Sequence, residues 1–143
     1  MRVFQNFFQL SARQRGFHLI TNEVLEYCSN VESIEAGVFH LFIQHSSASL
    51  TVNENADSSV REDFESHFNK MVPEDEPHYT HTYEGSDDMP AHIKSSILGT
   101  SVSIPISSGR LALGTWQGIY LCEHRDHATA RSFVATISGK LFE

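Results

Sequence analysis

The sequence predicts an α+β fold, with a mostly antiparallel β-sheet and two or three helices. Many short apolar runs rich in strand-favouring residues follow one another in hairpin order, and only a few segments show helical spacing. No Rossmann crossover or P-loop pattern occurs. The 143 residues, of which 40% are hydrophobic and ten are Phe, fit a single domain (1–143) with a packed core.

The N-terminal third predicts four strands and one helix. Residues 3–10 alternate loosely, and 17–20 form a short run that we expect to be their hairpin partner. A short helix is expected over Thr21–Tyr27, with Thr21 as its cap. The nearly continuous apolar run 38–43 predicts a strand that points Phe39, Leu41, Ile43 and His45 to one face, and 48–52 predicts another.

A longer helix is expected to begin where Ser59 and Glu62 fit a capping box. Apolar residues then recur at helical spacing as far as about Met71. Residues 73–87 are acidic and carry two prolines, which predicts a long ordered loop. Loops of this length without secondary structure are often functional.

The next segment predicts a short helix that carries an acidic and a basic side chain at its start. Asp88 suits the N-cap, Pro90 is tolerated in a first turn, and Gly99 can end the helix. Asp88 and His92 then lie one turn apart near the positive end of the helix. Such a pair suits proton transfer, metal binding or anion binding, although a capping Asp and a surface His would give the same pattern.

The C-terminal third predicts strands at four places. Residues 101–106 alternate, the turn 107–109 follows, and 110–113 begin the partner strand. Residues 119–124 and 133–137 give two more strands.

Composition narrows the classes of function. The formal net charge of −8 disfavours a broad nucleic-acid surface, so no nucleic-acid partner is expected. No segment has the length of a transmembrane helix, and the N-terminus lacks the apolar core of a signal peptide, so no membrane partner is expected. Cys28 and Cys122 have no zinc-motif spacing and are expected to be buried reduced thiols, which favours a cytoplasmic protein.

Three histidines stand at the ends of expected elements, where rigid frameworks usually hold functional groups. His45 and His124 end strands, and His92 lies in the first turn of a helix. Three imidazoles that leave one coordination position open are typical of catalytic zinc, although three unrelated polar histidines remain an alternative. The other six histidines are interpreted as structural or surface residues: His18, His40, His67, His78, His81 and His127.

Short polar side chains flank the first of these histidines. Ser46, Ser47 and Ser49 follow His45, but no strand–turn–helix elbow surrounds them, so they favour anion binding or turn formation over a hydrolase triad. Glu54 and Asp57 can bind a divalent ion or act as bases, or can simply place negative charge at the start of the following helix.

The glycine-bracketed turn 114–118 is a further candidate for ligand binding. Its backbone N–H groups can bind phosphate, and Trp116 with Gln117 can hold a flat ring, although an ordinary hairpin connection fits equally well. Arg110 and Arg125 are the best phosphate ligands by charge and shape, although a surface salt bridge would explain either.

Four strings taken together resemble the YjbQ-like family, whose members are named secondary thiamine-phosphate synthase enzymes or proteins of unknown function. They are HSSASL (45–50), NENAD (53–57), EGSDDMPAHIK (84–94) and LGTWQGIYLCEHR (113–125). The resemblance implies a compact α+β fold with sandwich-like sheets that assembles as a homotrimer. It also implies a secondary activity that joins a pyrimidine diphosphate to a thiazole phosphate and releases diphosphate.

The family motif positions correspond here to His45, Glu54, Asp57, Asp88, His92, Gln117, His124 and Arg125. We therefore expect a small enzyme that acts on a phosphorylated or anionic substrate. The expected catalytic residues are His45, Glu54, Asp88, His92 and His124. The expected substrate-binding residues are Ser46, Ser47, Asp57, Gln117 and Arg125. A divalent ion, zinc or magnesium, is expected on His45, His92 and His124.

The alternatives are a metal-dependent hydrolase of a small phosphorylated substrate and a non-catalytic metabolite-binding trimer. All three hypotheses require distant imidazoles and carboxylates to meet around one cavity.

Overall fold

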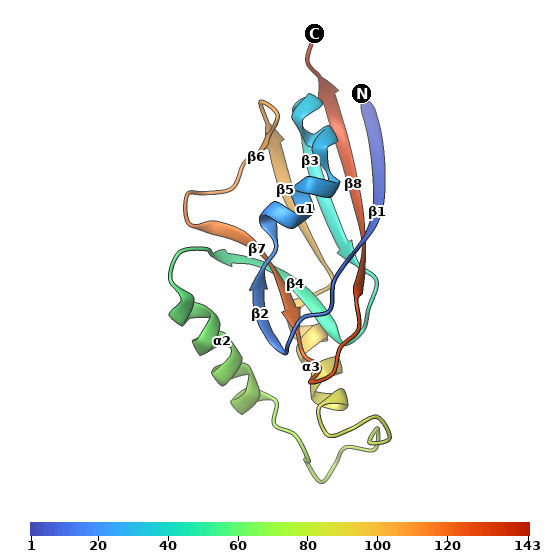
Figure 1. The fold of residues 1–143 in the computed structure, drawn as a ribbon, viewed down its shortest axis with the longest axis vertical. Helices are drawn as coiled ribbons and strands as arrows, with labels where there is room; N and C mark the ends of the chain where they lie inside the picture. Colours follow the sequence, from blue (N-terminus) through green and yellow to red (C-terminus); the bar gives the residue numbers. More distant parts are fainter.

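Two antiparallel β-sheets form the framework of the protein, and three α-helices lie against them (Figure 1). The computed structural model describes residues 1–143. The large sheet has the strand order β1-β8-β3-β5-β6, and the small sheet has the order β2-β7-β4. The two termini lie together at one end of the large sheet, and α3 lies at the opposite end of the molecule (Figure 1). The expected α+β class is confirmed.

The strands extend slightly beyond most of their expected limits. The large sheet comprises β1 (Arg2–Leu10), β8 (Arg131–Leu141), β3 (Ile34–Ile43), β5 (Ser101–Ser107) and β6 (Arg110–Leu111). The small sheet comprises β2 (Gly16–Leu19), β7 (Gln117–Glu123) and β4 (Ala48–Glu54).

The main core joins both sheets. The inward-facing residues of β3, Phe39, Leu41 and Ile43, are fully buried, as their alternation predicts. They belong to one cluster of 19 buried residues that also contains Leu50 of β4 and Leu121 of β7. Because the apolar faces of both sheets are buried together, removing either sheet would expose the other.

The expected hairpin between the first two strands is wrong. All nine residues of β1 pair with β8, from Arg2 opposite Gly139 to Leu10 opposite Arg131, whereas the four residues of β2 pair with β7. The physical reason is that the two apolar runs belong to different cores. Phe8 packs in the main core, but Phe17 packs in a second cluster with Tyr120 and Cys122.

The three helices occupy nearly the expected segments: α1 (Thr21–Tyr27), α2 (Ser58–Met71) and α3 (Asp88–Leu98), with a 3-10 turn η1 (Ser29–Ser33) after α1. Phe64 and Phe68 of α2, with Leu98 of α3, pack on the second cluster. Residues 72–87 connect α2 to α3 without helix or strand, as expected. This connection is the yellow-green loop at the bottom of Figure 1.

The helix caps differ from the sequence-based expectations. Helix α2 is capped by Asp57, whose carboxylate accepts from the N–H of Ser59, and no Ser59–Glu62 capping box forms. Thr21 does not cap α1, because its hydroxyl accepts from the N–H of Ile119 in β7. Gly99 ends α3 with φ of 104°, as expected.

Both cysteines, Cys28 and Cys122, are free and buried, as expected. None of the helices combines the length and the hydropathy needed to cross a membrane.

Candidate functional site

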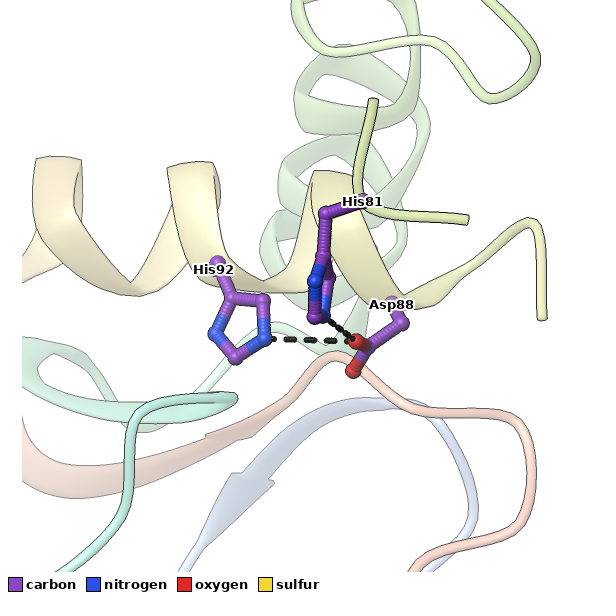
Figure 2. Close-up of side chains that lie close together, drawn as sticks. All are labelled: His81, Asp88 and His92. Carbon is purple, nitrogen blue, oxygen red and sulfur yellow. Dashed lines mark hydrogen bonds and ion pairs between the residues drawn. The ribbon is translucent and has the colours of Figure 1, made fainter. Parts of the chain in front are cut away.

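Two imidazoles and one carboxylate meet at the start of α3 (Figure 2). Asp88 and His92 lie one turn apart on the same face of the helix, and His81 comes from the connection between α2 and α3. One ligand atom from each residue lies within 4.8 Å of the other two. We call this set the α3 triad.

The carboxylate of Asp88 lies at the centre of the α3 triad. Its side chain is only 2% exposed. Its Oδ2 atom lies 2.7 Å from Nε2 of His81 and 3.3 Å from Nε2 of His92, and both contacts end on that oxygen in Figure 2. Asp88 was expected to cap α3, but Asp87 takes the N-cap position without a side-chain cap bond. The contacts of Asp88 explain the difference, because they hold its carboxylate beside the helix.

The other oxygen of Asp88 is fixed by an arginine. Nη1 of Arg125 donates to Oδ1 of Asp88 at 2.6 Å, Nε donates to Oδ2 of Asp87 at 2.8 Å, and Nη2 donates to the carbonyl of Glu84 at 2.8 Å. Each nitrogen of the guanidinium therefore donates within the chain, which favours a structural role for Arg125 over phosphate binding. Burial opposes ionisation of Asp87, but bonds from Asp126 N–H and Arg125 outweigh it and hold the pKa of Asp87 below its usual value.

The ring of His92 is oriented by the segment that joins β3 to β4. Its Nδ1 lies 2.8 Å from the carbonyl oxygen of Ser46. A carbonyl can only accept, so Nδ1 carries the proton of this bond. In the neutral ring Nε2 then has a lone pair, and this lone pair faces Asp88.

The α3 triad has the donors of a transition-metal site. Two donors about 2.1 Å from a shared tetrahedral ion lie about 3.4 Å apart. The 3.3 Å between Nε2 of His92 and Oδ2 of Asp88 matches this separation, whereas the 2.7 Å between Nε2 of His81 and the same oxygen is a hydrogen bond that would lengthen when both atoms bind one ion. Two imidazoles and one carboxylate suit zinc or iron and leave a coordination position open, whereas magnesium prefers oxygen ligands alone. The donor set therefore fits zinc better than magnesium.

The expected ligands His45 and His124 are not part of this set. Nε2 of His45 accepts from the N–H of Ser132 at 2.8 Å, and burial, with the charge of Arg131, lowers the pKa of His45. Nε2 of His124 pairs with the hydroxyl of Ser49 at 2.8 Å, and burial lowers the pKa of His124 to about 3. In both residues Nε2 is hydrogen-bonded within the fold. The trio of His45, His92 and His124 therefore does not form a ligand set in one chain.

A buried ion pair lies beside His45. Arg131 donates to both carboxylate oxygens of Glu123, at 2.7 and 2.5 Å, and both side chains are at most 6% exposed. Arg131 also donates to the hydroxyl of Ser47 at 3.1 Å and to its carbonyl at 3.3 Å. Ser47, expected to bind substrate, is therefore held by the fold, whereas Ser46 contributes its carbonyl to His92.

The remaining expected site residues lie at the far end of the small sheet. Ala48 of β4 pairs with Glu123, and Glu54, at the other end of β4, pairs with Gln117. Seven strand residues separate these ends by about 20 Å. Glu54, Asp57 and Gln117 thus do not share a cavity with the α3 triad within one chain, contrary to expectation.

The side chains at this end of the small sheet are hydrogen-bonded within the fold, exposed to solvent, or buried with an unpaired oxygen. Asp57 caps α2, and Oε1 of Gln117 accepts from the N–H of Gly114 at 2.8 Å, so this N–H is not free for phosphate. Trp116 is 65% exposed. One carboxylate oxygen of Glu54 is buried without a hydrogen-bond partner.

The family model for UPF0047 protein YjbQ-like matches residues 6–140. The chain belongs to the YjbQ-like UPF0047 family. The UPF0047 protein YjbQ of Salmonella typhimurium is 53% identical over 96% of this chain and 99% of its own length. The UPF0047 protein YugU of Bacillus subtilis is 36% identical over 80% of this chain and 84% of its own length.

Solved structures of the YjbQ-like family share the fold. A YbjQ-like protein of unknown function from Sulfolobus solfataricus superimposes with a TM-score of 0.84 at 27% identity, covering 97% of this chain and 99% of that one. An uncharacterized YjbQ/UPF0047 protein from Clostridium acetobutylicum superimposes with a TM-score of 0.81 at 34% identity, covering 92% of this chain and 98% of that one.

Sequence reasoning missed one member of the α3 triad in this YjbQ-like protein. His81 was interpreted as structural or surface, because a lone histidine in a loop has no motif. The available signal was its place in the acidic connection 73–87, because loops of this length are often functional.

Proposed function

We propose that the protein is a metal-dependent enzyme that acts on a small phosphorylated substrate. We further propose a secondary thiamine-phosphate synthase activity, which joins a pyrimidine diphosphate to a thiazole phosphate and releases diphosphate. The metal-dependent part rests on the α3 triad, and the specific reaction rests on the family resemblance.

The contact between His92 and Asp88 carries the proposal. Ser46 fixes the proton on Nδ1 of His92, so Nε2 and Oδ2 of Asp88 would present lone pairs to each other at 3.3 Å. This arrangement is favourable only when a cation, either a second ring proton or a metal ion, lies between them. His81 places a third ligand group beside the same oxygen, so the three side chains together can bind a metal ion if the His81–Asp88 hydrogen bond opens.

The surrounding residues fit this role. Metal-binding imidazoles usually donate their second N–H to a carbonyl or carboxylate, as His92 does to Ser46. Arg125 likewise anchors the oxygen of Asp88 that faces away from the imidazoles. When bound, a divalent ion would neutralise the charge that develops on a departing diphosphate.

The test measures zinc binding and reaction products in the same preparations. We expect the wild-type chain to bind one zinc ion, and His81→Ala and His92→Ala to lose zinc and activity while remaining folded. His67→Ala, which changes an exposed histidine on α2, is the matched control. Formation of thiamine phosphate from the two phosphorylated precursors would support the synthase.

The other outcomes separate the alternatives. Release of phosphate from the diphosphate precursor alone would indicate a metal-dependent hydrolase. Tight binding without turnover would indicate a non-catalytic binding protein. Full activity in both triad variants would reject the α3 triad as the site.

We also propose a homotrimer in the cytoplasm. The outer face of the large sheet exposes Phe7 (70%), Val38 (46%) and Phe42 (41%), and no helix covers it, which favours burial against other subunits. The free buried thiols fit a reducing compartment. Light scattering of the wild type and of Phe7→Lys tests the assembly, since a monomeric wild type would contradict it.

A further inference from the structure

A hollow of about 290 Å³ adjoins the α3 triad and has no assigned ligand. His81 lines it, so the hollow and the triad share a residue. The other lining side chains include Asp75, Glu76, Tyr79, Thr82, Ser86 and Met89. All but Met89 come from the connection between α2 and α3, which therefore supplies both a metal donor and the wall of the hollow.

Some of the polar side chains that line the hollow are hydrogen-bonded within the chain, and others are not. The hydroxyl of Tyr79 donates to the carbonyl of Pro73 at 2.9 Å, and that of Ser86 donates to Glu74 at 2.5 Å. The carboxylates of Asp75 and Glu76, in contrast, enter no hydrogen bond or ion pair within the chain. The hollow thus offers two free anionic acceptors.

The nearby arginines are already paired. Arg125 is bound to Asp87, Asp88 and the carbonyl of Glu84. Arg15 donates to Glu65, Glu74, Asp126 and Asn69 at 2.7 to 3.2 Å. No arginine is therefore left to attract an anion into the hollow, and the free carboxylates repel one.

We propose that this hollow is the specificity subsite of the proposed metal site, and that it takes the cationic or hydrogen-bond-donating end of the substrate. The inference rests on the proposed function, because the phosphate end of such a substrate would be bound at the α3 triad. The ligand class is a phosphorylated molecule with an amine or a protonated ring nitrogen at its other end. Asp75 and Glu76 disfavour a substrate with a second anionic end.

The experiment compares matched non-hydrolysable probes on the zinc-loaded protein at physiological salt, where long-range charge effects are screened. The probes are ω-aminoalkyl phosphonates and ω-carboxyalkyl phosphonates with linkers of about two to five carbons, short enough for a small ligand pocket. Calorimetric titration measures the dissociation constant of each. We expect the amine to bind about tenfold or more tightly than the carboxylate at the best-fitting length, as one charge-assisted hydrogen bond would give.

Substitutions test whether Asp75 and Glu76 cause the preference for the amine probe. The double variant Asp75→Asn with Glu76→Gln should lose most of the preference while keeping zinc affinity, because neither residue belongs to the α3 triad. Asp63→Asn, which removes an exposed charge on α2, is the matched control and should keep the preference. Equal binding of amine and carboxylate, binding of neither by zinc-loaded protein, or an unchanged preference in the double variant would overturn the subsite.

Zinc titration of the same samples separates this failure from that of the proposed function. A protein that binds zinc through the triad but does not discriminate between the probes keeps the metal site and loses the subsite. A protein that binds no zinc loses the metal site, and the inference that rests on it falls as well.

Discussion

Arg125 holds Asp88 through a 2.6 Å bond from Nη1 to Oδ1, while Oδ2 of the same carboxylate faces two imidazoles. The two oxygens of one side chain thus have different partners, a fixed cation on one side and His81 with His92 on the other. Because Asp87 and the carbonyl of Glu84 hold the rest of the guanidinium, the carboxylate cannot rotate freely.

Arg125 should therefore act on metal binding by positioning Asp88. We expect Arg125→Gln to weaken zinc affinity by about 10- to 100-fold, the usual effect of removing a residue that orients a metal ligand. Arg125→Lys should restore part of the affinity, since it keeps the charge but not the fork. Competition with a chromophoric chelator measures the constants.

Arg110→Gln is the control for the loss of one positive charge. Arg110 is exposed on β6 and forms no ion pair, so its replacement should leave zinc affinity unchanged. If Arg125→Gln bound zinc as tightly as the wild type, the positioning role would be wrong.

Residues at the far end of the small sheet should not affect zinc binding at the α3 triad of the same chain. Glu54 and Gln117 pair at the end of β4 that is farther from Ser46, about 20 Å along this seven-residue strand from Ala48. We expect Glu54→Gln and Gln117→Ala to leave the zinc constant of one chain unchanged in the same chelator assay. A loss of more than about tenfold in a monomeric sample would contradict the separation.

The buried ion pair of Glu123 in β7 and Arg131 in β8 joins the two sheets and should contribute to the stability of the fold. Glu123→Gln leaves Arg131 buried without its counter-charge, which we expect to cost about 3–5 kcal/mol in the free energy of unfolding. Urea denaturation followed by circular dichroism measures the loss. The double replacement Glu123→Leu with Arg131→Met should recover much of it, and an equal loss in both variants would show that the ion pair is not the cause.

Most of the fold was accessible from the sequence, because period-2 and helical patterns reflect local burial. The alternation around Phe39 placed β3 correctly, and Gly99 marked the end of α3. Strand pairing was not accessible in the same way. The partner of β1 is β8, at the other end of the chain, and no local pattern specifies a contact over that separation.

The candidate site was accessible only where its residues are neighbours along one helix. Asp88 and His92 were found from their spacing of four, which any α-helix converts into proximity. His81 was missed, and His45 and His124 were expected in its place, because convergence from separate loops depends on tertiary packing. The buried environments of His45 and His124, in which Nε2 of each ring is hydrogen-bonded within the fold, have no signature in the chain itself.

His124 should make the protein sensitive to mild acid. Its folded-state pKa of about 3 lies below the ordinary value of 6.5, because burial opposes the charged ring. Between these values the unfolded chain takes up a proton that the folded chain does not. Stability is therefore complete above about pH 6.5 and falls as the pH decreases towards 3, by at most about 1.4 kcal/mol per pH unit for this one group.

Urea denaturation at several pH values between 7.5 and 4.5 measures this slope. His124→Gln keeps a polar partner for Ser49 but cannot take up a proton, so its slope should be shallower than that of the wild type. His45, whose pKa is also lowered by burial, should supply part of the slope that remains. His67→Gln, on the exposed side of α2, serves as the control, and identical slopes for wild type and His124→Gln would refute the assignment.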